Sequence, residues 1–188
     1  MSNCGPVQNC HQKYPEDCSD SGNTIQKVYM NISCDNDKND NRQEGFGYHD
    51  KVEFKYDEIT PPIDTLISVN TPVLQVDFST INPGDRVWLS GVVHLSNDSG
   101  NATARVTITI TRSSPLSGTP VTIYSSRFRI DNTSGDDSVL EPFSHVDVPN
   151  TQLFDVRYQV LLSVSDPNPN LIIENIGPNT LTAIRFIR

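Results

Sequence analysis

The four cysteines of this 188-residue chain all lie near its start, at Cys4, Cys10, Cys18 and Cys34. Their spacing, C-x5-C-x7-C-x15-C, contains no C-x2-C pair, so a zinc site has little support even with His11 beside Cys10. Reduced thiols and disulfides are the other chemistries open to them. Because no cysteine follows Cys34, disulfides would close loops within this segment or bond to other molecules. We favour disulfides between copies of the chain, with all four cysteines as candidates.

An acidic run follows the last cysteine and is spaced in part like a calcium loop. Asp35, Asp37, Asn39 and Asn41 match the first ligand positions. The glycine of the sharp turn is replaced by an aspartate, however, and the twelfth position is Phe46 instead of glutamate. These departures exclude an EF-hand. We favour a solvated acidic linker, with weak calcium binding as the alternative, and we expect no resident metal and no cofactor.

The sequence contains none of the motifs of the common enzyme classes. It has no G-x-S-x-G, no H-E-x-x-H, no glycine-rich phosphate loop and no dinucleotide fingerprint. His94 and His145 fall in or near predicted strands, and neither has a nucleophile at a diagnostic spacing. A pair of carboxylates brought together by folding stays open, because such partners need not be close in the chain. We predict that the protein is not an enzyme.

Charge and hydropathy exclude two classes of partner. The chain has 14 basic and 23 acidic residues, and its net charge of -9 repels the phosphate backbone of nucleic acids. No apolar run approaches the roughly 18 residues of a membrane span, and the first residues lack the pattern of a signal peptide. We therefore expect no nucleic-acid partner, no membrane insertion and no classical export signal.

Residues 1–50 are too polar to build a core, and we interpret them as a cysteine-bearing arm and acidic linker. The arm holds one apolar cluster, which is a candidate for a short strand that forms when the arm binds a partner. A second candidate strand follows the arm, alternates apolar and charged residues, and is cut off by Pro61-Pro62. The candidate assembly residues are Ile25, Val28 and Ile32 in the cluster, and Val52, Phe54 and Tyr56 in the second strand.

From Thr65 onward, apolar and polar residues alternate with a period of two between turn residues such as Asn82-Pro-Gly-Asp85. This pattern predicts antiparallel strands with one wet face per sheet and no helix. We therefore predict an all-β domain over residues 51–188, an antiparallel β-sandwich of jelly-roll type with a core of Val, Ile, Leu and Phe and the single Trp88. The predicted strands are 66–69, 73–78, 86–95, 104–112, 121–130, 144–148, 155–164, 171–176 and 180–187, with an acidic loop over 131–141.

The chain resembles known proteins in its plan of a short cysteine-bearing arm followed by a Thr/Ile/Val-rich jelly roll. The jelly roll closes with Asn170-Leu-Ile-Ile-Glu-Asn-Ile-Gly-Pro-Asn-Thr-Leu-Thr-Ala-Ile-Arg-Phe-Ile-Arg188. It is similar to the endospore appendage (pilus) subunits and jelly-roll exosporium proteins of spore-forming Firmicutes. The resemblance implies subunits that stack through sheet edges, arm cysteines that bond to neighbours, and an extracellular or spore-surface location. The arm is longer here and its cysteines are scattered, so only the general role carries over, to Cys4, Cys10, Cys18 and Cys34.

The function we predict is a structural subunit that polymerises with copies of itself into a filament or surface layer. Open sheet edges add strands readily, and either residues 52–56 or the terminal strand 181–187 would be the joining edge. The alternatives are a ligand- or carbohydrate-binding module and a viral capsid or fibre jelly roll. A sugar site would display aromatic platforms, whereas Trp88, between Val87 and Leu89, is expected in the core.

Overall fold

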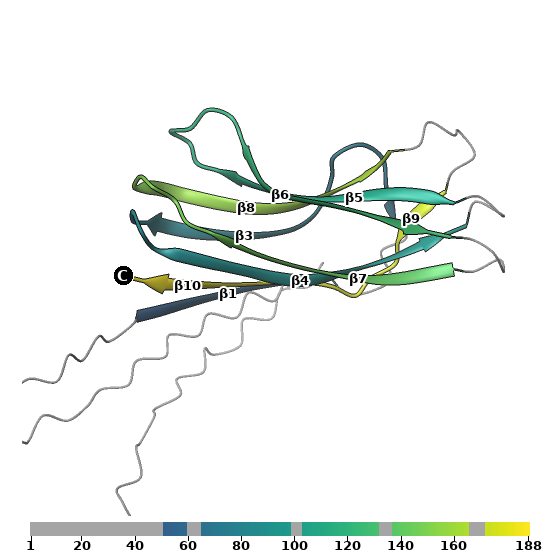
Figure 1. The fold of residues 1–188 in the computed structure, drawn as a ribbon, viewed down its shortest axis with the longest axis horizontal. Helices are drawn as coiled ribbons and strands as arrows, with labels where there is room; N and C mark the ends of the chain where they lie inside the picture. Colours follow the sequence, from purple (N-terminus) through teal and green to yellow (C-terminus); the bar gives the residue numbers. More distant parts are fainter. Residues whose placement is uncertain (1–50, 60–64, 99–102, 132–136, 166–171) are drawn as a thin grey trace, which may run out of the picture.

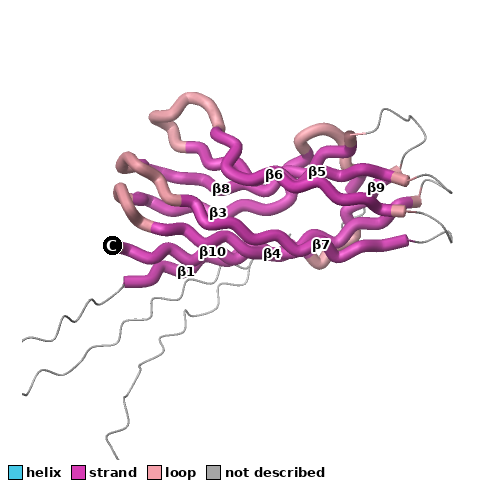
Figure 2. Tube along the Cα trace, viewed as in Figure 1, coloured by secondary structure: helices cyan, strands magenta, loops and turns pink. Residues whose placement is uncertain are grey.

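The computed structural model describes residues 51–59, 65–98, 103–131, 137–165 and 172–188. Within these ranges the chain forms ten strands and no helix. The strands make two antiparallel sheets that stack face to face, as Figures 1 and 2 show. The predicted all-β sandwich is therefore confirmed for the described part of the chain.

The larger sheet, sheet A, has four long strands and two short ones that extend it at one end. The long strands lie in the order β1 (Lys51–Ile59), β10 (Asn179–Ile187), β4 (Arg86–Asn97) and β7 (Asp137–Asp147). The short β9 (Ile173–Asn175) pairs with the end of β4, and β2 (Thr65–Leu66) pairs with β9. Sheet A thus has β1 and β7 as its long edge strands.

The smaller sheet, sheet B, consists of four strands in the order β3 (Thr71–Ile81), β8 (Leu153–Val164), β5 (Ala104–Ser113) and β6 (Val121–Ile130). Its edge strands are β3, which packs beside β1 of sheet A, and β6, which packs beside β7. The edge strands of the two sheets therefore meet along two sides of the sandwich, β1 beside β3 on one side and β6 beside β7 on the other.

The core forms between the sheets because alternate residues of each strand point inward. In β5, Val106, Ile108 and Ile110 are fully buried. Each such side chain contributes about 1.5–3 kcal/mol through its removal from water. Phe78 and Tyr158 meet edge to face in the same core with ring centroids 6.0 Å apart. The predicted alternation of faces is thus the basis of the core.

Several turns lie together at one end of the sandwich, and this end carries the candidate functional surfaces. The β3–β4 turn has Pro83 followed by Gly84 at φ 86°, a backbone conformation that glycine adopts without strain, and Asp85 N–H donates to the Asn82 carbonyl at 3.1 Å. The β5–β6 loop, the β7–β8 turn and the last residue of the chain lie at the same end (Figure 1).

Two sequence predictions about the strands were wrong. The terminal strand is β10, which lies between β1 and β4 and has both edges paired, so residues 181–187 are not a joining edge. The predicted acidic loop ends early, because β7 begins at Asp137 and its first half pairs with the end of β4. Both outcomes depend on pairing between distant strands, which local alternation does not encode.

Candidate functional site

The outward face of sheet B is polar. Thr107 pairs with Arg127 and Arg105 with Arg129, and their neighbours Val106 and Ile108 are buried, so these polar side chains face away from the core. The same face of β8 carries Arg157 and Gln159 beside Asp77 and Gln75 of β3. The prediction of one wet face per sheet holds for this sheet.

The outward face of sheet A carries a patch of apolar side chains. The register places Val52 next to Phe186, and it sets Phe54, Ile184, Trp88 and Val146 in one row across four strands. Paired residues of an antiparallel sheet share a face, so these side chains form one continuous surface. The next row on this face is polar (Tyr56, Thr182, Ser90 and Ser144), so the outward face that the sequence predicted to be wet also carries an apolar patch.

Trp88 belongs to this outward face, and its predicted place in the core was wrong. Its neighbours Val87 and Leu89 are fully buried, so the side chain between them must point away from the core. The indole is 40% exposed, and its Nε1–H donates to Ser144 Oγ at 2.9 Å. The alternation of residues in β4 predicts an outward side chain at Trp88, whereas the hydrophobicity of the indole favours the core.

The sequence-predicted assembly residues divide into two groups. Val52, Phe54 and Tyr56 lie on the outward face of β1, at an edge of sheet A, as half-buried side chains. The Tyr56 hydroxyl donates to Glu58 Oε2 at 2.6 Å, and burial, this hydrogen bond and the adjacent acidic charges raise the pKa of Tyr56 to about 12. The remaining candidates lie outside the described residues, as do the proposed calcium ligands: Cys4, Cys10, Cys18, Cys34, Ile25, Val28, Ile32, Asp35, Asp37, Asn39 and Asn41.

A hollow of about 600 Å³ opens on the outward face of sheet A near the last residue of the chain. We call it the Trp88 hollow; its lining includes the apolar side chains of Trp88, Val146 and Phe186 and the basic residues Arg86 and Arg188. Neither guanidinium forms an ion pair with another described residue. The hollow thus combines an apolar floor with two cations.

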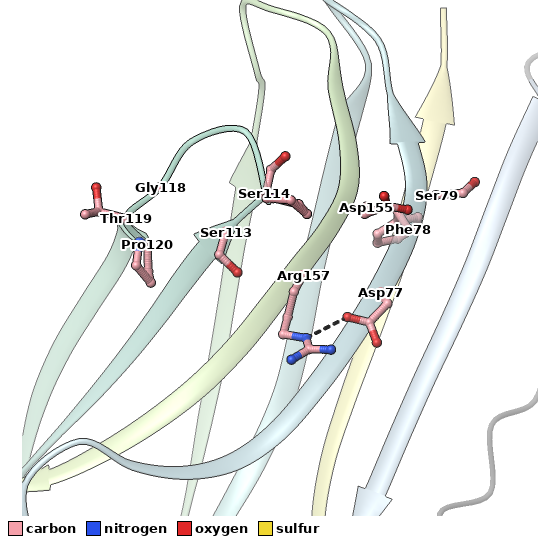
Figure 3. A pocket seen from close by; sticks show the side chains of 11 residues that line it. Asp77, Phe78, Ser79, Ser113, Ser114, Gly118, Thr119, Pro120, Asp155 and Arg157 are labelled. Atoms are coloured by element: carbon pink, nitrogen blue, oxygen red, sulfur yellow. Dashed lines mark hydrogen bonds and ion pairs between the residues drawn. The ribbon is translucent and has the colours of Figure 1, made fainter.

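A second hollow, of about 610 Å³, lies on sheet B beneath the β5–β6 loop (Figure 3). Arg157 Nε donates to Asp77 Oδ1 at 2.9 Å within it, and Ser113 and Thr119 contribute hydroxyls. Asp155 adopts a left-handed backbone with φ 47° at the same hollow. Such a lining can form hydrogen bonds to a polar ligand. Its only aromatic residue, Phe78, is 1% exposed, so the platform typical of sugar sites is missing from it.

A buried ion network holds the end of the sandwich that carries both hollows. Arg185 points inward from β10 and donates through Nε and Nη2 to Asp85 Oδ2 at 2.9 and 2.6 Å, and through Nη1 to Glu53 Oε2 at 3.1 Å. Backbone N–H groups of Asn82 and Arg188 also donate to the Asp85 carboxylate. Burial alone would raise the pKa of Asp85, but these hydrogen bonds and the Arg185 charge outweigh it and lower that pKa.

A second network joins the two sheets through the interior. Arg112 of β5 donates through Nη1 to both oxygens of Asp147 in β7, at 2.8 and 2.6 Å, and the buried Tyr158 hydroxyl of β8 donates to the same carboxylate at 2.8 Å. Burial, followed by the Asp147 charge and hydrogen bond, raises the pKa of Tyr158. The network fixes β7 of sheet A against β5 and β8 of sheet B.

The histidines of the described residues are engaged in structural contacts. His94 forms a hydrogen bond through Nδ1 with the Gly177 carbonyl, and its backbone N–H donates to Asn179 Oδ1 at 2.8 Å. His145 packs against the Tyr124 ring with centroids 5.7 Å apart. Within the described ranges, no three His, Cys, Asp or Glu side chains are grouped to hold a metal ion. These ranges also contain no helix long and apolar enough to cross a lipid bilayer.

Fold and surface together define a β-sandwich protein whose two sheets differ outside the core: the outward face of sheet B is polar, and that of sheet A carries an apolar patch. No protein-family model and no curated protein matches the chain.

Proposed function

We propose that the protein is a non-enzymatic structural subunit that assembles with copies of itself through strand edges, and that the arm cysteines then cross-link neighbouring subunits. The product would be a filament or surface layer outside the cell or on a spore. The proposed domain is a jelly roll. This topology is supported by the order of the eight long strands, 1-8-3-6 in sheet A and 2-7-4-5 in sheet B when they are numbered along the chain.

The observation that carries the proposal is the free edge of β6. From Tyr124 to Ile130 this edge strand keeps an uninterrupted register with β5, and it contains no proline. Its outer edge has no partner strand among the described residues. Arg127 and Arg129 face outward from the sheet and leave the edge itself open. A regular edge of this length is a template for strand addition.

The other three edges carry features that hinder strand addition. β3 contains Pro72 and a register shift beside it, and its Gln75 N–H already donates to Asp57 Oδ2 of β1 at 2.7 Å. β7 contains Pro142 in mid-strand. β1 turns charged side chains toward the sandwich interior, including Lys55 and Asp57. Proline, bulges and inward charges are the devices that protect natural edges. We therefore assign the edge contact to β6 in place of the predicted residues 52–56.

Two adjacent serines of β6 give a matched test of this edge. Amides of consecutive strand residues point to opposite sides, so one of Ser125 and Ser126 has its N–H on the free edge and the other faces β5. Ser125→Pro and Ser126→Pro therefore remove donors on opposite sides of the strand, and their side chains lie on opposite faces of the sheet, Ser125 exposed and Ser126 half-buried. The variant that blocks the β5 side should lose about 1–3 kcal/mol of folding stability, because a β5 carbonyl loses its donor, whereas the free-edge variant should lose less.

The assay is sedimentation velocity of each variant over a concentration series under reducing conditions, with the free energy of unfolding measured in urea. The proposal predicts that the free-edge proline variant loses self-association that the native protein shows. If the native protein self-associates and this variant associates equally well, the β6 edge is not the contact. If the native protein stays monomeric at every concentration and under oxidation, the proposed function is wrong.

A further inference from the structure

The apolar patch on the outward face of sheet A lacks a cover among the described residues. Trp88, Phe186 and Val146 around the Trp88 hollow are 40%, 42% and 51% exposed, whereas the outward face of sheet B is lined by Arg, Thr and Gln. We propose that residues 25–32 of the same molecule dock into the Trp88 hollow. This docking is independent of assembly through β6.

The composition of this segment suits the hollow. Ile25, Val28 and Ile32 form the only apolar cluster of residues 1–50, and the hollow offers an indole, a phenyl ring and a valine as its floor. Burying such side chains against each other removes apolar area from water on both partners. An exposed apolar surface bordered by charged residues is a usual mark of a docking site.

The place where the arm joins the fold favours its own hollow. Lys51 pairs with Ile187 and Val52 with Phe186, so the arm enters sheet A beside the wall of the hollow. Figure 1 shows the start of β1 next to the end of β10. Residues 33–50 separate the segment from β1 along the chain, and n residues of chain span at most about 3.3–3.6 Å times n. The segment is therefore within reach of the hollow.

Charge also favours this occupant. Arg86 and Arg188 line the hollow without an ion pair among the described residues. The segment is flanked by Asp20 before it and by Asp35 and Asp37 after it, and it contains one cation, Lys27. Carboxylates on both sides of an apolar stretch complement two arginines beside an apolar floor. A second copy of the sandwich is the weaker candidate, because the segment belongs to the same chain as the hollow and reaches it without a bimolecular step.

Trp88 makes the docking measurable, since it is the only tryptophan of the chain. The test compares the full-length native protein with the triple variant Ile25→Gln, Val28→Gln, Ile32→Gln under reducing conditions. A matched control carries Ser19→Gln, Ser21→Gln and Ser33→Gln, which place the same new residue beside the segment without removing apolar groups. The readouts are the acrylamide quenching constant of Trp88 and its emission maximum.

We expect the triple variant to show a quenching constant higher by about twofold and a red-shifted emission, because an uncovered indole regains contact with water. The control should match the native protein. Adding salt should raise quenching of the native protein, and Arg86→Glu should raise quenching at low salt and reduce this salt response, since charge pairs at a surface are screened. Circular dichroism of each variant verifies that the sandwich is folded.

Two outcomes would overturn the inference. Equal quenching of native protein and triple variant would show that residues 25–32 do not cover Trp88. A quenching constant that changes on dilution would show that the cover comes from another copy and not from the same molecule. Neither outcome bears on assembly through β6, which the proline variants test separately.

Discussion

Two arginine–aspartate pairs of this protein share the same contact distance and differ in burial. Arg185 Nε lies 2.9 Å from Asp85 Oδ2, and Arg157 Nε lies 2.9 Å from Asp77 Oδ1. The side chains of the first pair are 7% and 1% exposed, and those of the second are 50% and 42% exposed. Substituting each arginine with methionine therefore compares an arginine–aspartate pair in two environments, and Arg185→Met also removes the bonds from Nη2 to Asp85 and from Nη1 to Glu53.

We expect Arg185→Met to cost about 3 kcal/mol, because it leaves the buried Asp85 carboxylate without its cation. The backbone N–H groups of Asn82 and Arg188 stay bonded to that carboxylate and keep the loss at the lower end of the usual range. Arg157→Met should cost less than about 1 kcal/mol, because water screens an exposed pair. Urea unfolding at pH 7, followed by circular dichroism, measures both values.

The pH dependence of folding stability in the same variants tests whether the lost charge pair with Asp85 causes the destabilisation. The pKa of Asp85 is lowered in the folded protein, so its contribution to stability is present above the ordinary aspartate pKa and is lost as pH falls through the folded pKa. The difference between native protein and Arg185→Met should accordingly narrow when unfolding is repeated at a pH of about 3. Equal costs for the two arginine variants at pH 7, or a gap that widens in acid, would refute the reasoning.

The remaining predictions concern the core and are each checked by denaturant unfolding. Gly91→Ala should cost about 3 kcal/mol or more, because its Cβ would clash with the Thr180 carbonyl of β10 and lie 2.6 Å from Phe143 Cζ, whereas the neighbouring Ser90→Ala should change stability by less than about 0.5 kcal/mol. Above a pH of about 10 the unfolded state ionises tyrosine while burial and Asp147 keep Tyr158 neutral, so stability should fall by up to about 1.4 kcal/mol per pH unit for this group. Tyr158→Phe should remove that share of the alkaline loss, and an unchanged alkaline slope would contradict the assignment.

The sequence predicted the sandwich well because period-two alternation is local. Val106, Ile108 and Ile110 alternate with threonines, and β5 buries the first set as expected. The turn at Asn82-Pro-Gly-Asp85 likewise lies where its residues indicated. Local pattern and turn chemistry are the parts of the fold that neighbouring residues determine.

The surfaces could not be predicted in the same way, because they depend on which strands become neighbours. The row that joins Phe54, Ile184, Trp88 and Val146 combines four strands from distant parts of the chain. The Arg185–Asp85 pair spans a separation of 100 residues. No spacing rule in a single sequence connects such residues. The outward direction of Trp88 could have been predicted, because it lies between two core residues of the same strand.

Negative-stain electron microscopy of the oxidised full-length protein, run beside non-reducing and reducing gels, decides whether this chain is a cross-linked structural subunit. The parallel sample replaces Cys4, Cys10, Cys18 and Cys34 with serine. We predict filaments or sheets for the native protein, a ladder of covalent oligomers that collapses on reduction, and assemblies without a ladder for the serine variant. Single particles and a monomer band for the oxidised native protein at high concentration would contradict the proposed function.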